Sequence, residues 1–264
     1  MSYKNPLTYL IPFLFIVILA LNLQVKLDQH FINLAQSFIE GRLSFTHVNN
    51  NVSDYVLFNN KYYWPLGPFP AVLLIPFIIC FQSFSQSYIS FLLTIINFYL
   101  IYKIAKHFEL DNQKSLLLAV FFVFGSVFTP LLALPASWYF AQVVAATLLI
   151  WAIYEFLNKR RYFLIGFALA LATATRFNLI FASLFFFFYL FKKPFNLINI
   201  IKFVSPIILS VAILSIYNYQ RFGNALETGY NLQIIYDQAD SRRAGGLFSL
   251  KHIPANLYYM LFQG

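Results

Sequence analysis

Cysteine and charged side chains are both scarce in this chain of 264 residues. The single cysteine, Cys80, excludes an intrachain disulfide and a zinc site built on cysteines. Charged residues make up 10% of the sequence, against about 25% in an ordinary soluble domain. The sequence also lacks a P-loop, an H-E-x-x-H motif, a G-x-S-x-G motif and any internal repeat. The low charge content rules out a cytosolic globular enzyme.

Apolar and aromatic side chains take the place of charge, at 60% and 20% of the chain. This composition excludes a disordered protein and suits a surface that faces lipid, with aromatic belts at both interfaces. A net charge of +9 in a soluble protein would suggest a nucleic-acid partner. Here the basic residues form short clusters between apolar runs, so we interpret them as topology signals and expect no nucleic-acid partner.

Apolar runs long enough to cross a bilayer need roughly 17–25 residues. The candidates are Leu7–Leu23, Pro68–Phe84, Tyr88–Ala105, Ser115–Leu134, Trp138–Leu157, Tyr162–Phe191 and Phe203–Tyr219. The sequence therefore predicts an all-α, polytopic membrane protein. The basic clusters are Lys103, Lys106 and Lys114; Lys159, Arg160 and Arg161; and Lys192, Lys193 and Lys202. The positive-inside rule places all three clusters, together with Lys4, in the cytoplasm.

Counting crossings constrains two of these runs. If Pro68–Phe84 spanned the membrane, the Lys103 cluster would lie outside. The run also carries three prolines, which break helices, so we expect it to be an interfacial or re-entrant segment. Tyr162–Phe191 is basic at both ends, so we expect a hairpin of two short helices with Arg176 near its outer tip. The result is about seven crossings in the inner membrane, with the N-terminus in the cytoplasm.

This topology leaves two outer polar regions, residues 24–67 and 220–264, where chemistry is expected. In the first, apolar residues at helical spacing predict an amphipathic surface helix over Asp28–Glu40, which Gly41 ends. Asp28 is either the N-cap of that helix or a functional carboxylate at the membrane surface. Asp54 is either a solvated turn residue or a second functional carboxylate.

Basic and aromatic side chains supply the other candidates. Arg176 is either an arginine that reaches the outer interface or an anion site, for which a phosphorylated lipid is the natural ligand. Lys61-Tyr62-Tyr63-Trp64 would lie at headgroup level, as part of a site or of an aromatic belt. Glu227 follows the last helix in a loop. His30 and His47 with Asp28 or Asp54 form a weak pattern for a divalent metal ion, and we predict no definite metal ligands.

These residues together resemble the GT-C glycosyltransferases, the superfamily of the protein O-mannosyltransferases and the bacterial aminoarabinose and related lipid-linked-sugar transferases. The resemblance comprises a carboxylate soon after the first helix, the segments Gly41-Arg42-Leu43 and Asn60–Pro70, Thr173-Ala174-Thr175-Arg176-Phe177, and Phe222–Tyr230. It extends in order over essentially the whole chain.

The resemblance implies inverting transfer of a sugar from a polyprenyl-phosphate donor to a lipid, glycan or protein acceptor on the outer face. Asp28 would be the base or the anchor of the acceptor or of a metal ion, with Asp54 as the second candidate, and Arg176 with Lys61 would hold the donor phosphate. The acceptor or sugar site would include Tyr62, Tyr63, Glu227 and Tyr230. Because family members usually continue with further helices, we expect residues 1–264 to be an N-terminal portion.

Two other classes remain open at this point. A polytopic transporter or lipid flippase also contains broken helices and an intramembrane arginine. An inactive membrane scaffold would have the same composition. Donor-dependent sugar transfer separates the first hypothesis from both of these.

Overall fold

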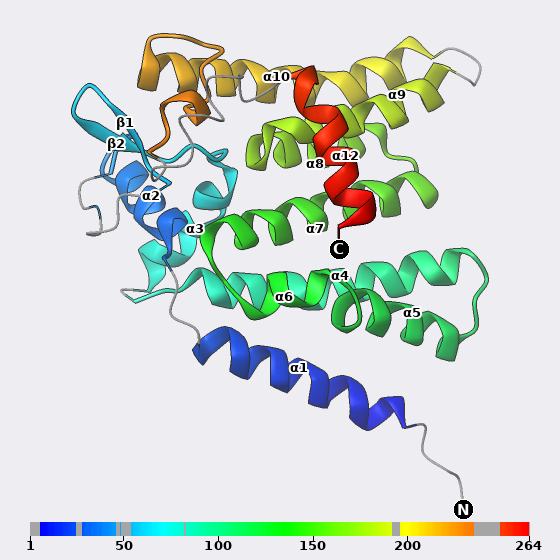
Figure 1. Ribbon diagram of the computed structural model, residues 1–264. Coiled ribbons are helices and arrows are strands. Elements are labelled where there is room, and N and C mark those ends of the chain that lie inside the picture. The colour runs from blue at the N-terminus through cyan, green and yellow to red at the C-terminus, as the bar shows by residue number, and fades with distance from the viewer. Residues whose placement is uncertain are drawn as a thin grey trace, which may run out of the picture.

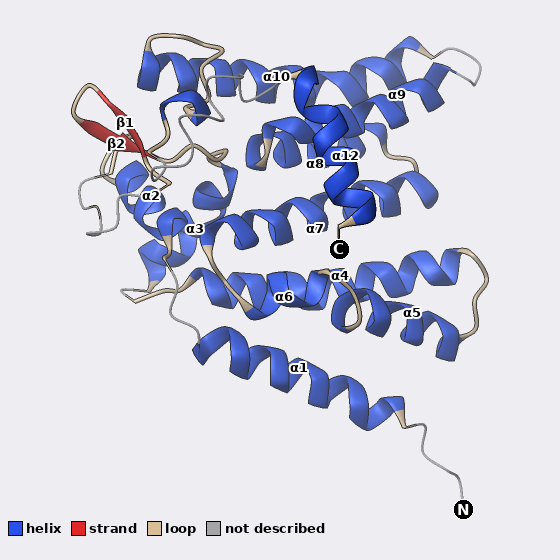
Figure 2. Ribbon diagram, viewed as in Figure 1, coloured by secondary structure: helices blue, strands red, loops and turns tan. Residues whose placement is uncertain are grey.

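The computed structural model describes residues 6–24, 28–45, 48, 54–81, 83–191, 196–234 and 249–263. Lys4, His47, Lys192 and Lys193, which entered the sequence predictions, lie outside this part of the chain. Helices dominate, as predicted, and the strands form one small hairpin (Figures 1 and 2). The helices are α1 (Leu7–Gln24), α2 (His30–Ile39), α3 (Phe69–Cys80), α4 (Gln86–His107), α5 (Asn112–Phe124), α6 (Phe128–Ala133), α7 (Ser137–Leu157), α8 (Tyr162–Thr175), α9 (Ala182–Phe191), α10 (Leu197–Phe222) and α12 (Ile253–Phe262). Short 3-10 turns are η1 (Phe177–Phe181), η2 (Tyr230–Leu232) and η3 (Leu250–His252).

Four helices of the described chain, α1, α4, α7 and α10, are long and apolar enough to cross a membrane. Each has at least 18 residues, which at 1.5 Å per residue reaches about 27 Å, close to the thickness of a hydrocarbon core. The helices α3, α5 and α8 are apolar but shorter. Large apolar side chains are exposed on the surface of the helix bundle, among them Ile16, Phe121, Phe185 and Ile208. Such a surface is suited to lipid.

The predicted run Ser115–Leu134 is not one helix. α5 ends at Phe124, and α6 begins at Phe128. The side chain of Ser126 turns the chain between them: its hydroxyl donates to the carbonyl of Phe122 and accepts from the amide of Phe128. A hydroxyl that satisfies backbone groups locally competes with the helix, and this explains the break.

The run Tyr162–Phe191 breaks at the predicted place. α8 ends at Thr175, and Arg176 has extended backbone angles (φ −141°, ψ 113°) before the 3-10 turn η1 and α9. In Figure 1, α8 and α9 run in opposite directions, so that the 30 apolar residues form two short helices joined near Arg176.

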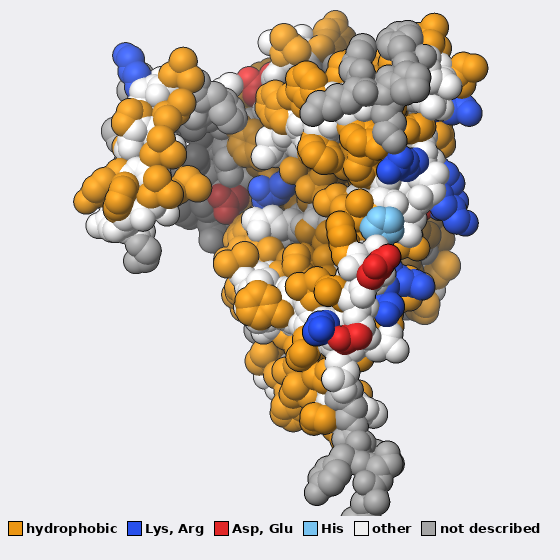
Figure 3. All heavy atoms as spheres, turned by 90° about the vertical axis from the view of Figure 1, so that its right-hand side faces the viewer, with side chains coloured by type: hydrophobic (Ala, Val, Ile, Leu, Met, Phe, Trp, Pro, Cys, Tyr) orange, Lys and Arg blue, Asp and Glu red, His pale blue; other side chains and the backbone are white. Residues whose placement is uncertain are grey.

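The helices extend between two ends of the molecule (Figure 1). One end, which we call the loop end, gathers α2, α3, the β-hairpin and η2. The other, the basic end, holds the α4–α5 and α7–α8 turns, which contain the basic clusters around Lys106 and Arg160. Figure 3 views the molecule from the basic end, where Lys and Arg side chains gather. Separated from the main body in that view is α12, whose residues are exposed.

Hydrogen bonds between polar groups link neighbouring helices. Asn97 of α4 donates to the Thr147 hydroxyl of α7 (2.9 Å), and Asn22 of α1 donates to the Leu132 carbonyl of α6 (2.6 Å). α8 and α10 cross closely at Gly166, where a Cβ atom would lie 2.0 Å from the Phe203 carbonyl oxygen. Small residues and interhelical hydrogen bonds of this kind hold helices together where water is absent.

The β-hairpin joins β1 (Val56–Phe58) to β2 (Lys61–Tyr63), with Val56 opposite Tyr63. Its two turn residues, Asn59 and Asn60, both have positive φ (47° and 58°), as a type I′ turn requires, and asparagine tolerates that conformation. The hairpin packs at the loop end, where Tyr63 contacts Phe222 at the end of α10.

Candidate functional site

The two polar regions, far apart in sequence, meet at the loop end. Asp54 donates its backbone amide to the carbonyl of Ile234, and the Ile234 amide returns a bond to Tyr55 (3.0 and 2.7 Å). These bonds extend the β-hairpin with a single residue pair, Val56 and Gln233. The region after α10 therefore closes over the first loop and forms cavities with it.

An aromatic cavity of about 260 Å³ lies under this closure. Its lining combines two indoles, a phenol, a carboxylate and an amide: Asp54, Trp64, Pro65, Leu66, Trp138, Tyr230 and Gln233. Asp54 is half-buried, and its left-handed backbone (φ 71°) lies directly before the first strand. Gln233 donates from Nε2 to Asp54 Oδ1 at 3.2 Å. Burial raises the pKa of Asp54, the nearby charge of Asp28 raises it further, and the bond from Gln233 partly opposes both.

Asp28 lies at the start of this region and is exposed. It does not cap α2: the cap position belongs to Gln29, whose side chain instead accepts from the Gln86 amide (3.0 Å). The Ser137 hydroxyl, at the start of α7, donates to the carbonyl of Asp28 (2.9 Å). The cap position predicted for Asp28 is therefore occupied by Gln29, and the main chain of Asp28 is fixed against α7.

His30 is buried beside these carboxylates, 3% exposed. Its ring stacks on Trp64 with centroids 4.1 Å apart, and its Nδ1 lies 3.1 Å from Ser137 Oγ. The Ser137 hydroxyl already donates its proton to the Asp28 carbonyl. Ser137 Oγ must therefore accept a hydrogen bond from His30 Nδ1–H, which identifies Nδ1 as the protonated ring nitrogen. Burial lowers the pKa of His30 to about 4, although Asp28 partly opposes the shift, so that the ring is neutral at physiological pH.

An arginine cavity of about 40 Å³ adjoins the aromatic cavity and shares Pro65, Leu66 and Tyr230 with it. Its two cations, Arg176 and Arg221, come from the break after α8 and from the last turn of α10. Arg176 is half-buried, and Nη2 donates to the Trp138 carbonyl at 3.3 Å. Its buried Nε has no hydrogen-bond partner among the described residues.

Arg221 is more deeply buried, at 4% exposure. Its Nη1 donates to the Trp64 carbonyl (2.8 Å), its Nη2 donates to Asn218 Oδ1 (2.7 Å), and the guanidinium stacks 4.0 Å from the Tyr217 ring. Within the described part of the chain no carboxylate forms an ion pair with either arginine. Two cations that share one cavity and form no ion pair in the described chain have the chemistry that suits an anion.

An apolar groove of about 410 Å³ continues from the arginine cavity between α3, α8 and α10, and both are bordered by Pro68 and Leu214. Phe69, Val72, Phe163, Phe167 and Ile213 are among its lining residues. The segment Trp64–Phe69 borders all three cavities, and we call it the shared wall. It lies against the end of α8 at Gly67, where a Cβ atom would be 2.1 Å from the Ala174 carbonyl oxygen. Glycine permits this close approach.

The structure places the other predicted site residues unevenly. Tyr230 lines both the aromatic and the arginine cavity; burial raises the pKa of its phenol, and the charge of Arg176 partly lowers it. Tyr63 is buried beneath Arg221 and Phe222. Lys61, Tyr62 and Glu227 line none of the three cavities. Glu227 instead accepts from the Gly229 amide (2.6 Å) and holds its own loop.

Sequence reasoning missed Arg221, Trp138 and Gln233. Arg221 lies just beyond the predicted end of the last apolar run, and its spacing of three from Asn218 was the available signal, because it puts both on one helical face. No local pattern marks Trp138 or Gln233. For the predicted metal pattern, the described residues contain no group of three or more His, Cys, Asp or Glu side chains able to hold an ion.

Comparisons with known proteins add no family: no family model, no curated protein and no solved structure matches this chain. The function must therefore be argued from the three cavities.

Proposed function

We propose that this chain belongs to a membrane glycosyltransferase that moves a sugar from a polyprenyl-phosphate donor to an acceptor on the outer face. The observation that carries the proposal is the order of the three cavities. An apolar groove leads into a cavity with two arginines, which leads into a cavity lined by tryptophans and a carboxylate. A lipid-linked sugar has the same order of parts: an apolar chain, a phosphate and a sugar.

The arginine cavity suits a phosphate. Guanidinium groups pair with phosphate oxygens through two parallel N–H bonds, and such bonds are strongest where water is excluded. Arg176 and Arg221 approach from different helices, and the Nε group of each is buried without a partner in the described chain. At these positions they would also stabilise the negative charge that develops on the departing polyprenyl phosphate.

The aromatic cavity suits a sugar. Both faces of a sugar ring carry C–H groups, which pack on indoles, while hydroxyls project from its rim. Trp138 offers an apolar ring surface, the buried Trp64 borders the cavity, and Asp54 and Gln233 offer hydrogen bonds.

The chemistry is a direct displacement at the anomeric carbon. The acceptor hydroxyl oxygen forms a bond to C1 as the bond between C1 and the phosphate oxygen breaks, which inverts the configuration. The electron pair leaves with the polyprenyl phosphate, and a carboxylate takes the hydroxyl proton. Asp28 is the proposed base and Asp54 the second candidate, whose raised pKa makes it a stronger proton acceptor than an ordinary carboxylate once ionised.

We further propose seven crossings of the inner membrane with the N-terminus in the cytoplasm. In support, α1, α4, α7, α8, α9 and α10 and the α5–α6 pair each run between the basic end and the loop end. α3 has 12 residues, about 18 Å, and packs beside α2 at the loop end. The proposed outer face is the loop end, where the arginine cavity and the aromatic cavity lie. No observation favours a transporter.

Binding in nanodiscs tests the proposal with two matched lipids, undecaprenyl phosphate and undecaprenol, detected by native mass spectrometry. We expect the phosphate to bind at least about tenfold more tightly, since it alone uses the arginines. Arg176→Lys should reduce that preference and Arg176→Ala should abolish it, whereas Arg42→Ala, outside the cavities, should not. Equal binding of both lipids would contradict the proposal.

A second measurement separates the enzyme from a flippase. Proteoliposomes that contain a polyprenyl-phosphate hexose with a labelled sugar, together with a membrane extract that supplies the acceptor, are assayed for released polyprenyl phosphate. The proposed enzyme produces it; a flippase moves the intact lipid and does not.

A further inference from the structure

A second apolar groove opens at the basic end, on the side of the molecule away from the proposed sugar site. It has a volume of about 510 Å³ and lies between α4, α7 and α9. Its lining is apolar throughout: Ile104, Phe108, Leu149, Ile153, Phe156, Leu157, Ala182, Phe185 and Phe186. From Leu149 to Leu157 along α7 the groove extends about 12 Å, at 1.5 Å per residue, over the surface of the helix bundle. The proposed function uses none of these residues.

Arg160 stands at the mouth of this groove. Its guanidinium carbon lies 6.0 Å from the ring centre of Phe156, which lines the groove, and 5.6 Å from that of Tyr189. The backbone holds it there: Arg160 has positive φ (50°), and its amide donates to the Glu155 carbonyl at 2.7 Å. The side chain is exposed, and within the described part of the chain no carboxylate pairs with it.

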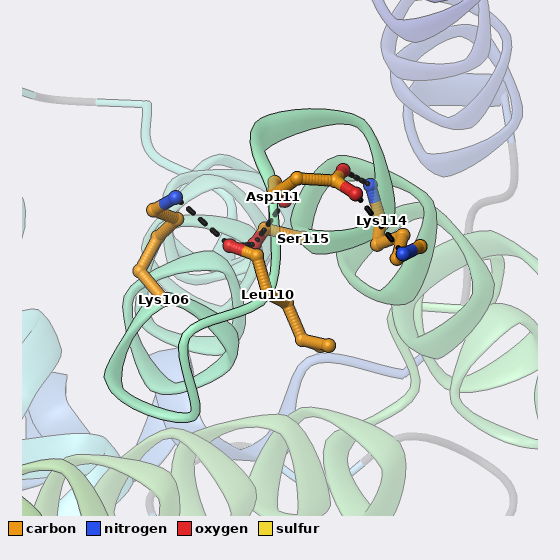
Figure 4. A network of polar contacts seen from close by, with 5 residues as sticks. All are labelled: Lys106, Leu110, Asp111, Lys114 and Ser115. Carbon is orange, nitrogen blue, oxygen red and sulfur yellow. Dashed lines mark hydrogen bonds and ion pairs between the residues drawn. The ribbon is translucent and has the colours of Figure 1, made fainter.

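The neighbouring cations are used locally. Arg161 forms a two-pronged ion pair with the buried Glu155. In the α4–α5 turn, Lys106 donates to the Leu110 carbonyl (2.8 Å) and Lys114 pairs with Asp111 (3.2 Å), as Figure 4 shows. Lys159 and Arg160 thus remain for an external ligand at this mouth.

The charge around the mouth is positive. Residues 103–114 and 155–161 carry six basic side chains and three acidic ones, and two of the three acids, Asp111 and Glu155, are already in ion pairs. A ligand with an apolar chain and a negative headgroup fits both parts of the site. A zwitterionic headgroup would bring its own cation against these lysines and arginines.

We propose that this groove binds one acyl chain of an anionic phospholipid, with the lipid phosphate on Arg160. The stacked guanidinium presents its N–H edge to the phosphate while its face rests on Phe156 and Tyr189. This site is independent of the proposed sugar transfer, because it shares no residue with the three cavities at the loop end.

The test compares phosphatidylglycerol with phosphatidylcholine of identical acyl chains, added to the full chain in detergent and counted by native mass spectrometry. We expect about one phosphatidylglycerol retained per protein, at least about tenfold more tightly than phosphatidylcholine. Arg160→Gln should remove the preference, and Ile153→Trp, which fills the groove, should remove the bound lipid. Matched controls are Lys114→Gln, a cation lost at the same end, and Leu117→Trp, an exposed apolar position on α5 outside the groove.

Equal retention of the two lipids would mean an ordinary surrounding lipid and would overturn the proposal. The proposal would also be overturned if Arg160→Gln preferred phosphatidylglycerol over phosphatidylcholine as strongly as Lys114→Gln does. Arg176→Ala should leave phosphatidylglycerol retention intact, and its loss there would mean that the lipid occupies the loop-end groove instead.

Discussion

The Arg221 guanidinium donates a 2.8 Å hydrogen bond to the main-chain carbonyl of Trp64, 157 residues earlier in the chain. This bond links the last long helix to the shared wall. It also fixes the direction of a buried cation whose other hydrogen bond, to Asn218, comes from its own helix. The remaining edge of the guanidinium lies in the arginine cavity.

Replacing Arg221 by lysine tests this arrangement. Lysine keeps the charge but cannot bond Trp64, Asn218 and a phosphate in one plane. We expect the affinity for undecaprenyl phosphate to fall about tenfold or more and the thermal unfolding midpoint to fall by several degrees. Arg42→Lys is the matched control, since Arg42 lies outside the cavities and pairs with Glu40. Unchanged lipid affinity in Arg221→Lys would argue against a phosphate site here.

Asp28→Asn separates catalysis from stability. Because Gln29, not Asp28, occupies the cap position of α2, the substitution should leave thermal unfolding unchanged. Loss of the proposed base should lower turnover by at least about 100-fold while lipid binding persists. If turnover persists, the base is Asp54, and its acid limb in the pH–activity profile should move to lower pH, because Asp28 no longer raises its pKa.

His30 predicts a pH dependence of stability. Its pKa falls from 6.5 to about 4 on folding, so the unfolded chain takes up a proton first as the pH decreases. The contribution of His30 to the free energy of unfolding is complete above pH 6.5. It is on the order of 3 kcal/mol and is lost as the pH falls to about 4. Denaturation in detergent should show a shallower pH dependence for His30→Gln, and the exposed His107→Gln should match the wild type. Identical profiles for His30→Gln and wild type would refute the assignment.

Gly67→Ala tests the close contact between the shared wall and α8. The new Cβ would lie 2.1 Å from the Ala174 carbonyl oxygen, so the wall must move away from Arg176. We expect a lower unfolding midpoint and weaker undecaprenyl phosphate binding. Gly125→Ala is the control: its Cβ meets only Phe121 of its own helix, at 3.1 Å, and binding should be unaffected.

Single cysteines test the proposed topology. In a Cys80→Ser background, Ser83→Cys and Gln113→Cys are both exposed positions that flank α4. An impermeant thiol reagent added to intact cells should label position 83 and reach position 113 only after the cells are opened. Labelling of position 113 in intact cells would place the basic end outside.

The sequence was a good guide to the helices. Apolar runs located α1, α4, α7 and α10, and parity of the basic clusters located the break near Arg176. The break at Ser126 was not predicted, because a hydrogen bond from a side chain to the backbone interrupts a helix without changing the hydropathy of the apolar run. The Asn59–Asn60 turn was visible in the sequence but was not predicted as a hairpin.

The site was only partly predictable, because its geometry depends on long-range packing. Arg176 and Tyr230 were identified and do border one cavity, whereas Lys61 and Glu227 lie elsewhere. Trp138 enters the site because α7 begins against Asp28 and His30, through Ser137. A relationship of that kind depends on residues more than 100 positions apart and leaves no periodic or local signature.

The shared wall has a thermodynamic consequence. Because Trp64–Phe69 borders the groove, the arginine cavity and the aromatic cavity together, we expect occupancy of one to change the free energy of occupying the others. By linkage the effect is reciprocal: whatever factor the lipid chain contributes to sugar affinity, the sugar contributes to lipid affinity. In the proposed enzyme the donor would therefore be recognised cooperatively, and the affinity measured for either half alone would not give its contribution to binding of the whole donor.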